Sequence, residues 1–259
     1  MSRKPLAVAP ALLLVVVSLW EVVATRRAAS AVPDDAAWDA ASQLVRASYQ
    51  PGDLIVFAPD WIDPVGRLHL GDLMSIDAAA RMDAARYGRI WELSIRGAHS
   101  PDVAGLAPAS EQTIEGVTVR RFERTPAIVV TDFLTQTPQS DGARAALELA
   151  EVGFAPHRCV QVTPVPGKPT RVTFHGVQLG TTLVGYAGLA DVFTRRDIRA
   201  PGMLAVEVGG KTLASAKLGV DDGWVRFETP TTPGTSDVTF VASADAPQRQ
   251  ICFAAEARK

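Results

Sequence analysis

The chain has 259 residues, of which 47% are hydrophobic and 21% are charged, which is a globular composition long enough for two domains. Its 26 basic and 28 acidic residues give a formal net charge of −2, so there is no basic excess for binding nucleic acid. Asparagine does not occur, which excludes N-glycosylation acceptor sites and a Cys-His-Asn catalytic set.

Residues 1–31 have the character of a membrane or export segment. Arg3 and Lys4 precede an apolar run from Pro5 to Trp20, and roughly twenty apolar residues suffice for a helix that crosses a bilayer. Two interpretations stay open: a retained signal anchor, and a signal peptide cleaved after small residues that end at Ala31. A buried helix is a third alternative. The first two both place the rest of the chain outside the cytoplasm, in the periplasm or at the cell surface, either anchored in the inner membrane or exported.

Residues 34–155 predict an α/β three-layer, Rossmann-like domain built around one buried strand. Leu54–Phe57 is a continuous apolar run, which is typical of a strand buried on both faces. A helical pattern precedes it, a second helix is expected over Ser75–Tyr87, and a returning strand is expected over Arg89–Ile95. A strand, a helix and a parallel strand make a crossover unit, in which ligands bind beyond the carboxyl ends of the strands.

The remainder of this region predicts two more strands and a third helix. The strands are expected over Val117–Glu123 and Ala127–Phe133. The helix is expected to begin at Ser140 or Asp141 and to place Ala150 on its inward face.

Three segments of residues 35–133 carry a family resemblance: PGDLIVFAPDW, RYGRIWELSIRG and GVTVRRFER. Their succession resembles the extracytoplasmic α/β domain of some bacterial glycosyltransferases of the dolichyl-phosphate-mannose-protein mannosyltransferase type. The resemblance implies a cell-envelope setting and partners among glycans, lipid-linked sugars or the glycosylation machinery. Those enzymes act through many membrane spans, whereas this chain has one apolar segment at most, so the resemblance does not extend to a catalytic part.

Residues 156–259 predict an all-β sandwich. Short runs such as Arg171–Phe174 and Leu204–Val208 alternate between apolar and polar side chains and are separated by Gly, Pro and Asp. The run from LVGYAGLADVF to DDGWVRFETPTTPGTSDVTFVAS resembles galactose-binding-like jelly-roll domains in its layout.

The two cysteines fall in the first and last expected strands of the sandwich. Cys159 and Cys252 alternate with apolar neighbours, so both are expected to face away from the core. A disulfide between them is expected outside the cytoplasm, and two separate reduced thiols are the alternative.

The loop after the buried strand is the first candidate for a binding site. Its chemistry-bearing residues are Asp60, Trp61, Asp63, Arg67, His69 and Asp72. An indole stacks on the CH faces of a sugar, while carboxylates, a guanidinium and an imidazole bond its hydroxyls. The alternative is a structural loop in which the tryptophan plugs the core and the aspartates cap turns.

Trp224 and Arg226 are the second candidate. Strand alternation places Trp224 beside Arg226 and away from the core, as an exposed platform for a sugar. The alternative is a tryptophan covered by a loop or by the neighbouring domain.

Motifs for other chemistries are missing from the sequence. The GGKT at 209–212 lacks the first glycine of a phosphate loop, the four histidines have no metal-ligand spacing, and no hydrolase or dinucleotide fingerprint occurs. We therefore expect no cofactor and no metal. The preferred interpretation is a membrane-tethered, non-catalytic extracytoplasmic protein that binds an envelope glycan or an assembly partner. The alternatives are a sugar-active enzyme or transferase accessory that uses the Asp60–Asp72 loop, and a purely structural brace in a membrane assembly.

Overall fold

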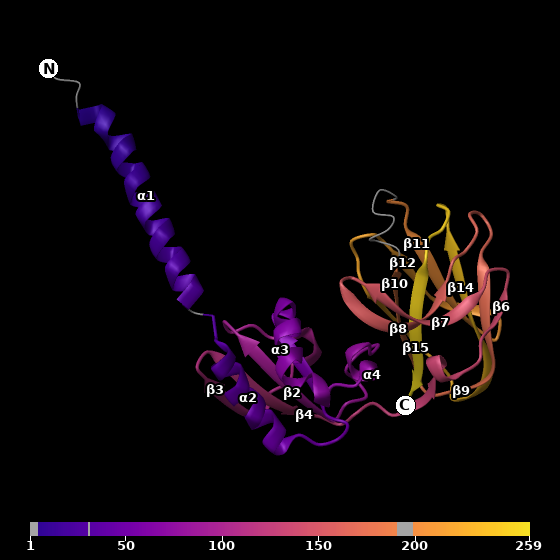
Figure 1. The fold of residues 1–259 in the computed structure, drawn as a ribbon. Coiled ribbons are helices and arrows are strands. Elements are labelled where there is room, and N and C mark those ends of the chain that lie inside the picture. Colours follow the sequence, from indigo (N-terminus) through magenta and orange to yellow (C-terminus); the bar gives the residue numbers. More distant parts are fainter. Residues whose placement is uncertain (1–4, 31, 191–198) are drawn as a thin grey trace. The chain divides into compact units, whose positions relative to one another are not determined.

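The computed structural model describes residues 5–30, 32–190 and 199–259 (Figure 1). The chain forms two compact units. Unit 1 takes in the chain up to Leu73 together with Arg89–Glu123, and unit 2 takes in Met74–Gly88 together with Arg124–Lys259. The chain therefore leaves unit 1 after Leu73, returns to it at Arg89 and leaves it again after Glu123.

Unit 1 is a four-stranded sheet with helices. Its α-helices are α1 (Pro5–Ser30), α2 (Asp35–Ser48) and α3 (Asp63–Leu70), and its 3-10 helices are η1 (Asp60–Ile62), η2 (Gly71–Leu73) and η3 (Pro101–Val103). Its strands are β1 (Leu54–Ala58), β2 (Arg89–Ile95), β3 (Pro108–Ile114) and β4 (Val117–Glu123), in the spatial order β1-β2-β4-β3. β1 and β2 pair in parallel, and the other neighbours pair antiparallel.

The prediction of a Rossmann-like three-layer domain is wrong. Such a domain needs a series of parallel strands joined by crossover helices, but this sheet has one parallel pair, and β1 lies at its edge. The predicted strands over 89–95 and 117–123 are present. The strand missed by the sequence analysis is β3, which joins β4 through a two-residue turn. Glu115 and Gly116 both have positive φ, as a type I′ hairpin turn requires.

The core of unit 1 lies between its sheet and the helices α2 and α3. All five residues of β1 are buried although β1 is an edge strand, because α3 covers it. Gly66 of α3 allows this approach, since a Cβ there would lie 2.0 Å from the ring of Phe57. Asp34 caps α2 by accepting a 2.9 Å hydrogen bond from the N–H of Ala37.

The N-terminal helix α1 exposes apolar side chains over residues 10–27. Leu12, Leu14, Trp20 and Val22 are each between 51% and 68% exposed. Among the described residues, no helix is both long enough and apolar enough to cross a membrane. Several residues used in the sequence predictions lie outside the described part of the chain: Arg3, Lys4, Ala31 and the end of the LVGYAGLADVF segment from Asp191.

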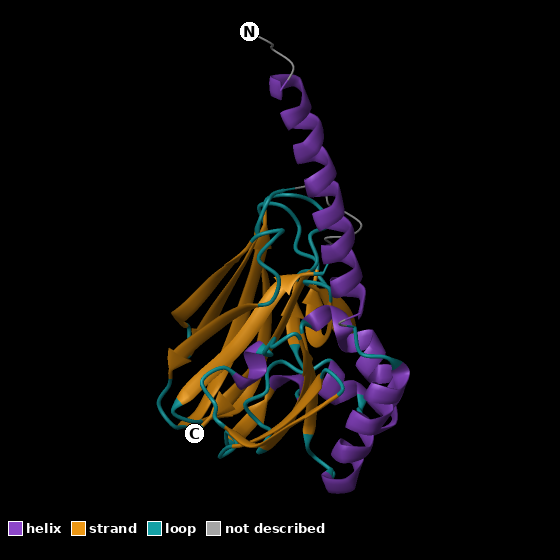
Figure 2. Cartoon of the chain, turned by 90° about the vertical axis from the view of Figure 1, so that its left-hand side faces the viewer, coloured by secondary structure: helices purple, strands orange, loops and turns teal. Residues whose placement is uncertain are grey.

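Unit 2 is a β-sandwich of two sheets. Strands, which are orange in Figure 2, make up most of its regular structure. Its small helices are α4 (Ile76–Ala79) and η4 (Phe133–Thr135), and its strands are β5 (Val129–Asp132), β6 (Gln139–Asp141), β7 (Ala145–Val152), β8 (Ala155–Val162), β9 (Thr170–Leu179), β10 (Thr182–Leu189), β11 (Gly202–Val208), β12 (Lys211–Leu218), β13 (Val225–Pro230), β14 (Gly234–Ala244) and β15 (Ile251–Arg258). One sheet has the order β13-β10-β15-β8-β7, with β5 paired to β15. The other has the order β12-β11-β14-β9-β6.

The sandwich predicted from the alternating runs is confirmed. Apolar side chains of both sheets meet in one core, where Phe133 packs edge-on against Phe174 and Phe240 at ring-centroid distances of 5.1 Å and 5.3 Å. The polar residues of the same strands point away from this core, as period-two alternation requires.

Two predicted helices of this unit do not form as expected. The helix expected from Ser140 or Asp141 is wrong, because this stretch forms β6 and β7. β7 pairs with β8 through a two-residue turn, Gly153-Phe154, in which both residues have positive φ. Long-range pairing thus outweighs the helix propensity of the Ala, Leu and Glu residues in β7. The helix expected over Ser75–Tyr87 is reduced to the single turn of α4.

Candidate functional site

The loop predicted to open into a binding crevice is helical. It forms η1, α3 and η2 in succession. Trp61 does not plug the core, since its side chain is 61% exposed, and the guanidinium of Arg96 lies 5.8 Å from the centroid of its ring. Asp60 beside it is also exposed.

The other residues predicted for this loop bind separate partners. Asp63 and Arg67 form an ion pair within α3. His69 Nδ1 lies 2.8 Å from a carboxylate oxygen of Asp39 in α2. Asp72 accepts two hydrogen bonds, of 2.6 Å and 2.7 Å, from the guanidinium of Arg46, which lowers the pKa of Asp72. Asp63 thus pairs with Arg67 and Asp72 with Arg46, while Nε2 of His69 is buried with no hydrogen-bond partner among the described residues.

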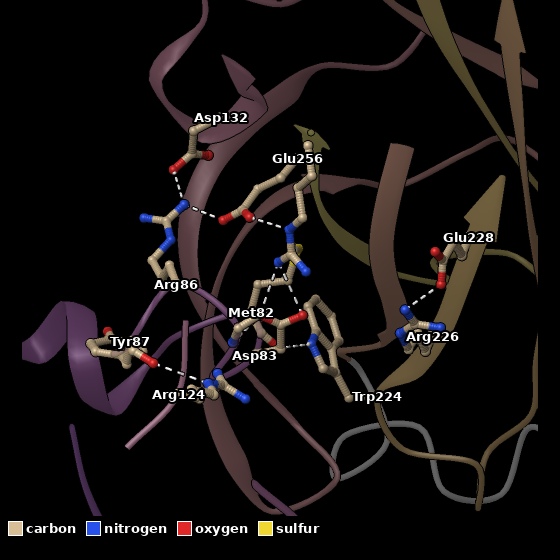
Figure 3. Close-up of polar contacts among 12 residues, drawn as sticks. Met82, Asp83, Arg86, Tyr87, Arg124, Asp132, Trp224, Arg226, Glu228 and Glu256 are labelled. Carbon is tan, nitrogen blue, oxygen red and sulfur yellow. Dashed lines mark hydrogen bonds and ion pairs between the residues drawn. The ribbon is translucent and has the colours of Figure 1, made fainter. Parts of the chain in front are cut away.

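Trp224 is covered rather than exposed as a platform. Its indole N–H donates a 3.1 Å hydrogen bond to the carbonyl oxygen of Met82 (Figure 3). The ring of His157 stacks on the indole at a centroid distance of 4.3 Å, and that of Tyr186 lies 6.1 Å away, nearly parallel to it. Arg226 is exposed and pairs with Glu228 on the same strand (Figure 3). It also lies directly opposite Tyr186 in the pairing of β13 with β10. The alternative of a covered tryptophan is therefore the one observed.

Unit 2 contains a pocket that the sequence analysis did not predict. It has a volume of about 390 Å³, which lies within the range of roughly 300–1,000 Å³ for small-molecule sites. Its lining residues come from the segment 74–88, from β5 and η4, and from β7, β8 and β15. They are Asp77, Ala80, Arg81, Met82, Asp83, Arg86, Tyr87, Asp132, Leu134, Thr135, Leu147, Arg158, Ala254, Ala255 and Glu256. None of the described residues predicted for a binding site is among them.

One wall of the pocket is held by three consecutive backbone carbonyls. The carbonyl of Ala80 accepts a 2.9 Å hydrogen bond from the N–H of Arg158. The next carbonyl, of Arg81, lies 3.1 Å from Nδ1 of His157, and the third, of Met82, is the acceptor for Trp224. These bonds replace the helical bonds expected for this segment, which explains why the helix predicted over 75–87 ends after one turn.

The charged groups of the pocket are linked by ion pairs. Glu256 is 3% exposed and lies between the guanidinium groups of Arg86 and Arg258. Arg86 also binds Asp132 at 2.7 Å (Figure 3). Arg258 binds both carboxylate oxygens of Asp83, at 2.9 Å and 3.0 Å. The five side chains form one network, in which every guanidinium lies between two carboxylates.

Burial shifts the pKa values of two groups around the pocket. Burial lowers the pKa of His157 to about 4, so its ring is neutral near pH 7 and donates from Nδ1 to the carbonyl of Arg81. Burial also raises the pKa of Tyr87, which keeps the phenol protonated. For Arg86, burial acts to lower the pKa, but the hydrogen bonds and charges of Asp132 and Glu256 outweigh it and raise the pKa.

The predicted disulfide between Cys159 and Cys252 is confirmed. The two Cα atoms are 5.5 Å apart, and both side chains are fully buried. They face away from the core of the sandwich, as expected, and pack with Val152 and Trp224 on the other side of the sheet. The disulfide therefore lies under the same indole that binds the pocket wall.

The alternation of the last strand contained a signal for this site. The sequence places Cys252 on the outward face, and period-two alternation places Ala254, Glu256 and Arg258 on that same face. Two charged residues on the outward face of a central strand indicate a polar partner from another segment. The sequence offered no comparable signal for Arg86 or Asp132, because the segments that carry them are far from β15 along the chain.

The described residues contain no group of three or more His, Cys, Asp or Glu side chains placed to hold a metal ion. No family model matches the chain, and no curated protein matches it.

Several solved structures of carbohydrate-binding modules are similar to part of the chain. The CBM51-2 and INT domains of Clostridium perfringens ZmpB match at 11% identity and a TM-score of 0.38, covering 60% of this chain and 40% of that one. The CBM51 of C. perfringens GH95, in complex with methyl-galactose, matches at 8% identity and a TM-score of 0.35, covering 46% of this chain and 92% of that one. The C-terminal CBM6 of LamC from Zobellia galactanivorans matches at 12% identity and a TM-score of 0.33, covering 52% of this chain and 99% of that one. A likeness at this level assigns neither a family nor a ligand to this chain.

Proposed function

We propose that this chain is a membrane-associated extracytoplasmic protein that binds a neutral envelope glycan in the pocket of unit 2, without catalysis. The buried disulfide supports the compartment, because disulfides persist in oxidising environments and are rare in the cytoplasm. The exposed apolar side chains of α1 support membrane association, because so long an apolar surface is rarely left in water.

The pairing of charges in the pocket is the observation that favours a neutral ligand over a charged one. The lining contains carboxylates and guanidinium groups in nearly equal number. Arg86 is engaged by Asp132 and Glu256, and Arg158 lies 2.5 Å from Asp77. A charged ligand would have to displace an internal partner, whereas a neutral polyol can add hydrogen bonds to groups that are already neutralised in pairs.

The apolar part of the lining suits the CH faces of a sugar ring. Leu134 and Leu147 offer aliphatic surface, and Leu147 is 50% exposed. Ala254 is buried on the outward face of β15, and its small side chain leaves space. Sugar rings present CH faces as well as hydroxyls, so they match a pocket that combines apolar walls with fixed polar groups.

A role beside glycan-assembly enzymes stays part of this proposal. It is favoured by the resemblance of residues 35–133 to the extracytoplasmic domain of mannosyltransferase-type enzymes, which remains a prediction. The binding expected at the loop from Asp60 to Asp72 also remains a prediction, with exposed Trp61 as its one accessible aromatic group.

A glycan array probed with the purified full chain tests the proposal. The array includes matched pairs of neutral glycans and their carboxylated or sulfated forms. We expect binding to one or more neutral glycans and weaker binding to the acidic form of the same glycan. Binding restricted to acidic glycans would contradict the ligand class. An absence of binding to every glycan would contradict the function and favour a structural brace.

A further inference from the structure

Three apolar side chains on one face of unit 1 are exposed to solvent and do not contribute to its core. Trp61, Val65 and Leu68 are 61%, 40% and 80% exposed. They are spaced by four and three residues along η1 and α3, a spacing that places side chains on one face of a helix. We call these three residues the α3 stripe.

The opposite face of the same segment already packs against the sheet. Ile62 and Leu70 are 1% and 0% exposed, and Gly66 lies against the ring of Phe57. The inward positions are thus filled by their own apolar residues. The α3 stripe is additional apolar surface, and such a surface next to polar residues marks an interaction site.

Arg96 adds a cation at one end of the stripe. Its guanidinium lies 5.8 Å from the ring centroid of Trp61. A tryptophan with a neighbouring cation suits the headgroup level of a bilayer, where an amphipathic ring and a positive charge are both favourable.

The position of the stripe within unit 1 indicates what covers it. His69, the residue after Leu68, contacts Asp39 in the first turns of α2 at 2.8 Å. The end of α3 therefore lies beside the start of α2. α2 begins at Asp35, only five residues after α1 ends at Ser30, and five residues span at most about 18 Å. A membrane that takes up α1 is thus within reach of the α3 stripe.

We propose that the α3 stripe binds the lipid bilayer surface, with Trp61 at the headgroup level and Leu68 among the upper acyl chains. This inference rests on the proposed membrane association through α1. Contact at a second place would fix the orientation of unit 1 on the membrane, whereas α1 alone would leave it free to rotate.

Spin labels on single introduced cysteines of the full chain test this inference. The variants are Leu68→Cys in the stripe, Leu14→Cys in α1, and Phe154→Cys as a control that is 77% exposed in unit 2. All three sites are exposed, so the native disulfide and the fold are expected to persist, which a thermal melt checks. The measurement is the accessibility of each label to oxygen and to a water-soluble nickel complex, with and without vesicles of equal phosphatidylcholine and phosphatidylglycerol.

On addition of vesicles, we expect the labels at positions 14 and 68 to lose most of their accessibility to nickel and to gain accessibility to oxygen. The label at position 154 is expected to stay in water. A label at position 68 that stays in water while the label at 14 enters lipid would overturn the inference and leave the membrane association intact. Labels at positions 14 and 68 that both stay in water after vesicles are added would contradict the membrane association itself. Protection of position 68 that grows with protein concentration without vesicles would assign the stripe to a second copy and overturn the inference.

Discussion

Trp224 donates its indole N–H to the backbone carbonyl of Met82 at 3.1 Å, and this bond joins the sandwich to the segment that forms one wall of the pocket. The same indole stacks with His157 and packs over the disulfide of Cys159 and Cys252. The pocket wall, the aromatic stack and the disulfide are therefore one packed assembly.

Replacing this indole by a ring without a donor isolates the hydrogen bond. Trp224→Phe retains much of the stacking but leaves the Met82 carbonyl without its partner, so we expect a loss of about 1 kcal/mol in the free energy of unfolding. Urea unfolding measures the loss. Trp61→Phe, at an exposed tryptophan, is the matched control and is expected to change stability by less than about 0.5 kcal/mol. Equal effects of the two substitutions would contradict the role of Trp224.

The buried carboxylate of Glu256 holds two guanidinium groups. Glu256→Gln removes the charge that lies between Arg86 and Arg258, and it is expected to destabilise the protein by about 3–5 kcal/mol. Glu228→Gln breaks an exposed pair with Arg226, and its expected cost is below about 1 kcal/mol. Denaturant unfolding compares the two. A cost at Glu256 as small as that at Glu228 would show that the network does not hold the pocket together.

The disulfide is expected to stabilise unit 2 through the length of the loop it closes. Its cysteines are 93 residues apart, so the chain-entropy relation gives about 4–5 kcal/mol for the bond. The double variant Cys159→Ala, Cys252→Ala is expected to melt at a clearly lower temperature than the wild type. Reductant should lower the melting temperature of the wild type and leave that of the double variant unchanged. A double variant that melts at the same temperature as the wild type would contradict this account.

Acid is expected to weaken the fold through His157. Its pKa of about 4 lies below the unfolded value of about 6.5, so the unfolded chain binds the proton more readily between these pH values. The stability that His157 contributes is present above about pH 6.5 and is lost as the pH falls toward 4, by up to about 3 kcal/mol. His157→Phe removes this group. The free energy of unfolding, measured at pH 7 and pH 5, should fall less in the variant, and an equal fall would contradict the assignment.

The sequence predicted the local features of the sandwich but not the long-range ones. Alternation along the strands of the second half identified the sheets, and the outward phase of Cys159 and Cys252 led to the disulfide. The stretch that became β7 has strong helix formers, and only its pairing with β8 makes it a strand. Local propensity carries no information about that partner.

The site was missed for a related reason. In Asp60–Asp72, acids and a tryptophan follow a buried apolar run, a pattern that indicates a crevice only in a parallel sheet. β1 lies at the edge of a mixed sheet, so the sheet lacks the series of parallel strands on which that expectation rested, and Asp72 and His69 of this segment contact Arg46 and Asp39. The pocket depends instead on Asp83, Arg86, Asp132 and Glu256, which are brought together by tertiary structure.

Binding of a neutral glycan in the pocket of unit 2 is tested most directly by a matched pair of substitutions on β7. Leu147 and Leu149 are 50% and 51% exposed and lie on the same face of the strand, but only Leu147 lines the pocket. Titration calorimetry with the neutral glycan selected on the array should show binding to the Leu149→Trp variant with wild-type affinity. The Leu147→Trp variant, in which the indole occupies the pocket, should lose binding. Equal affinity of both variants for the glycan would place the binding elsewhere and contradict the account.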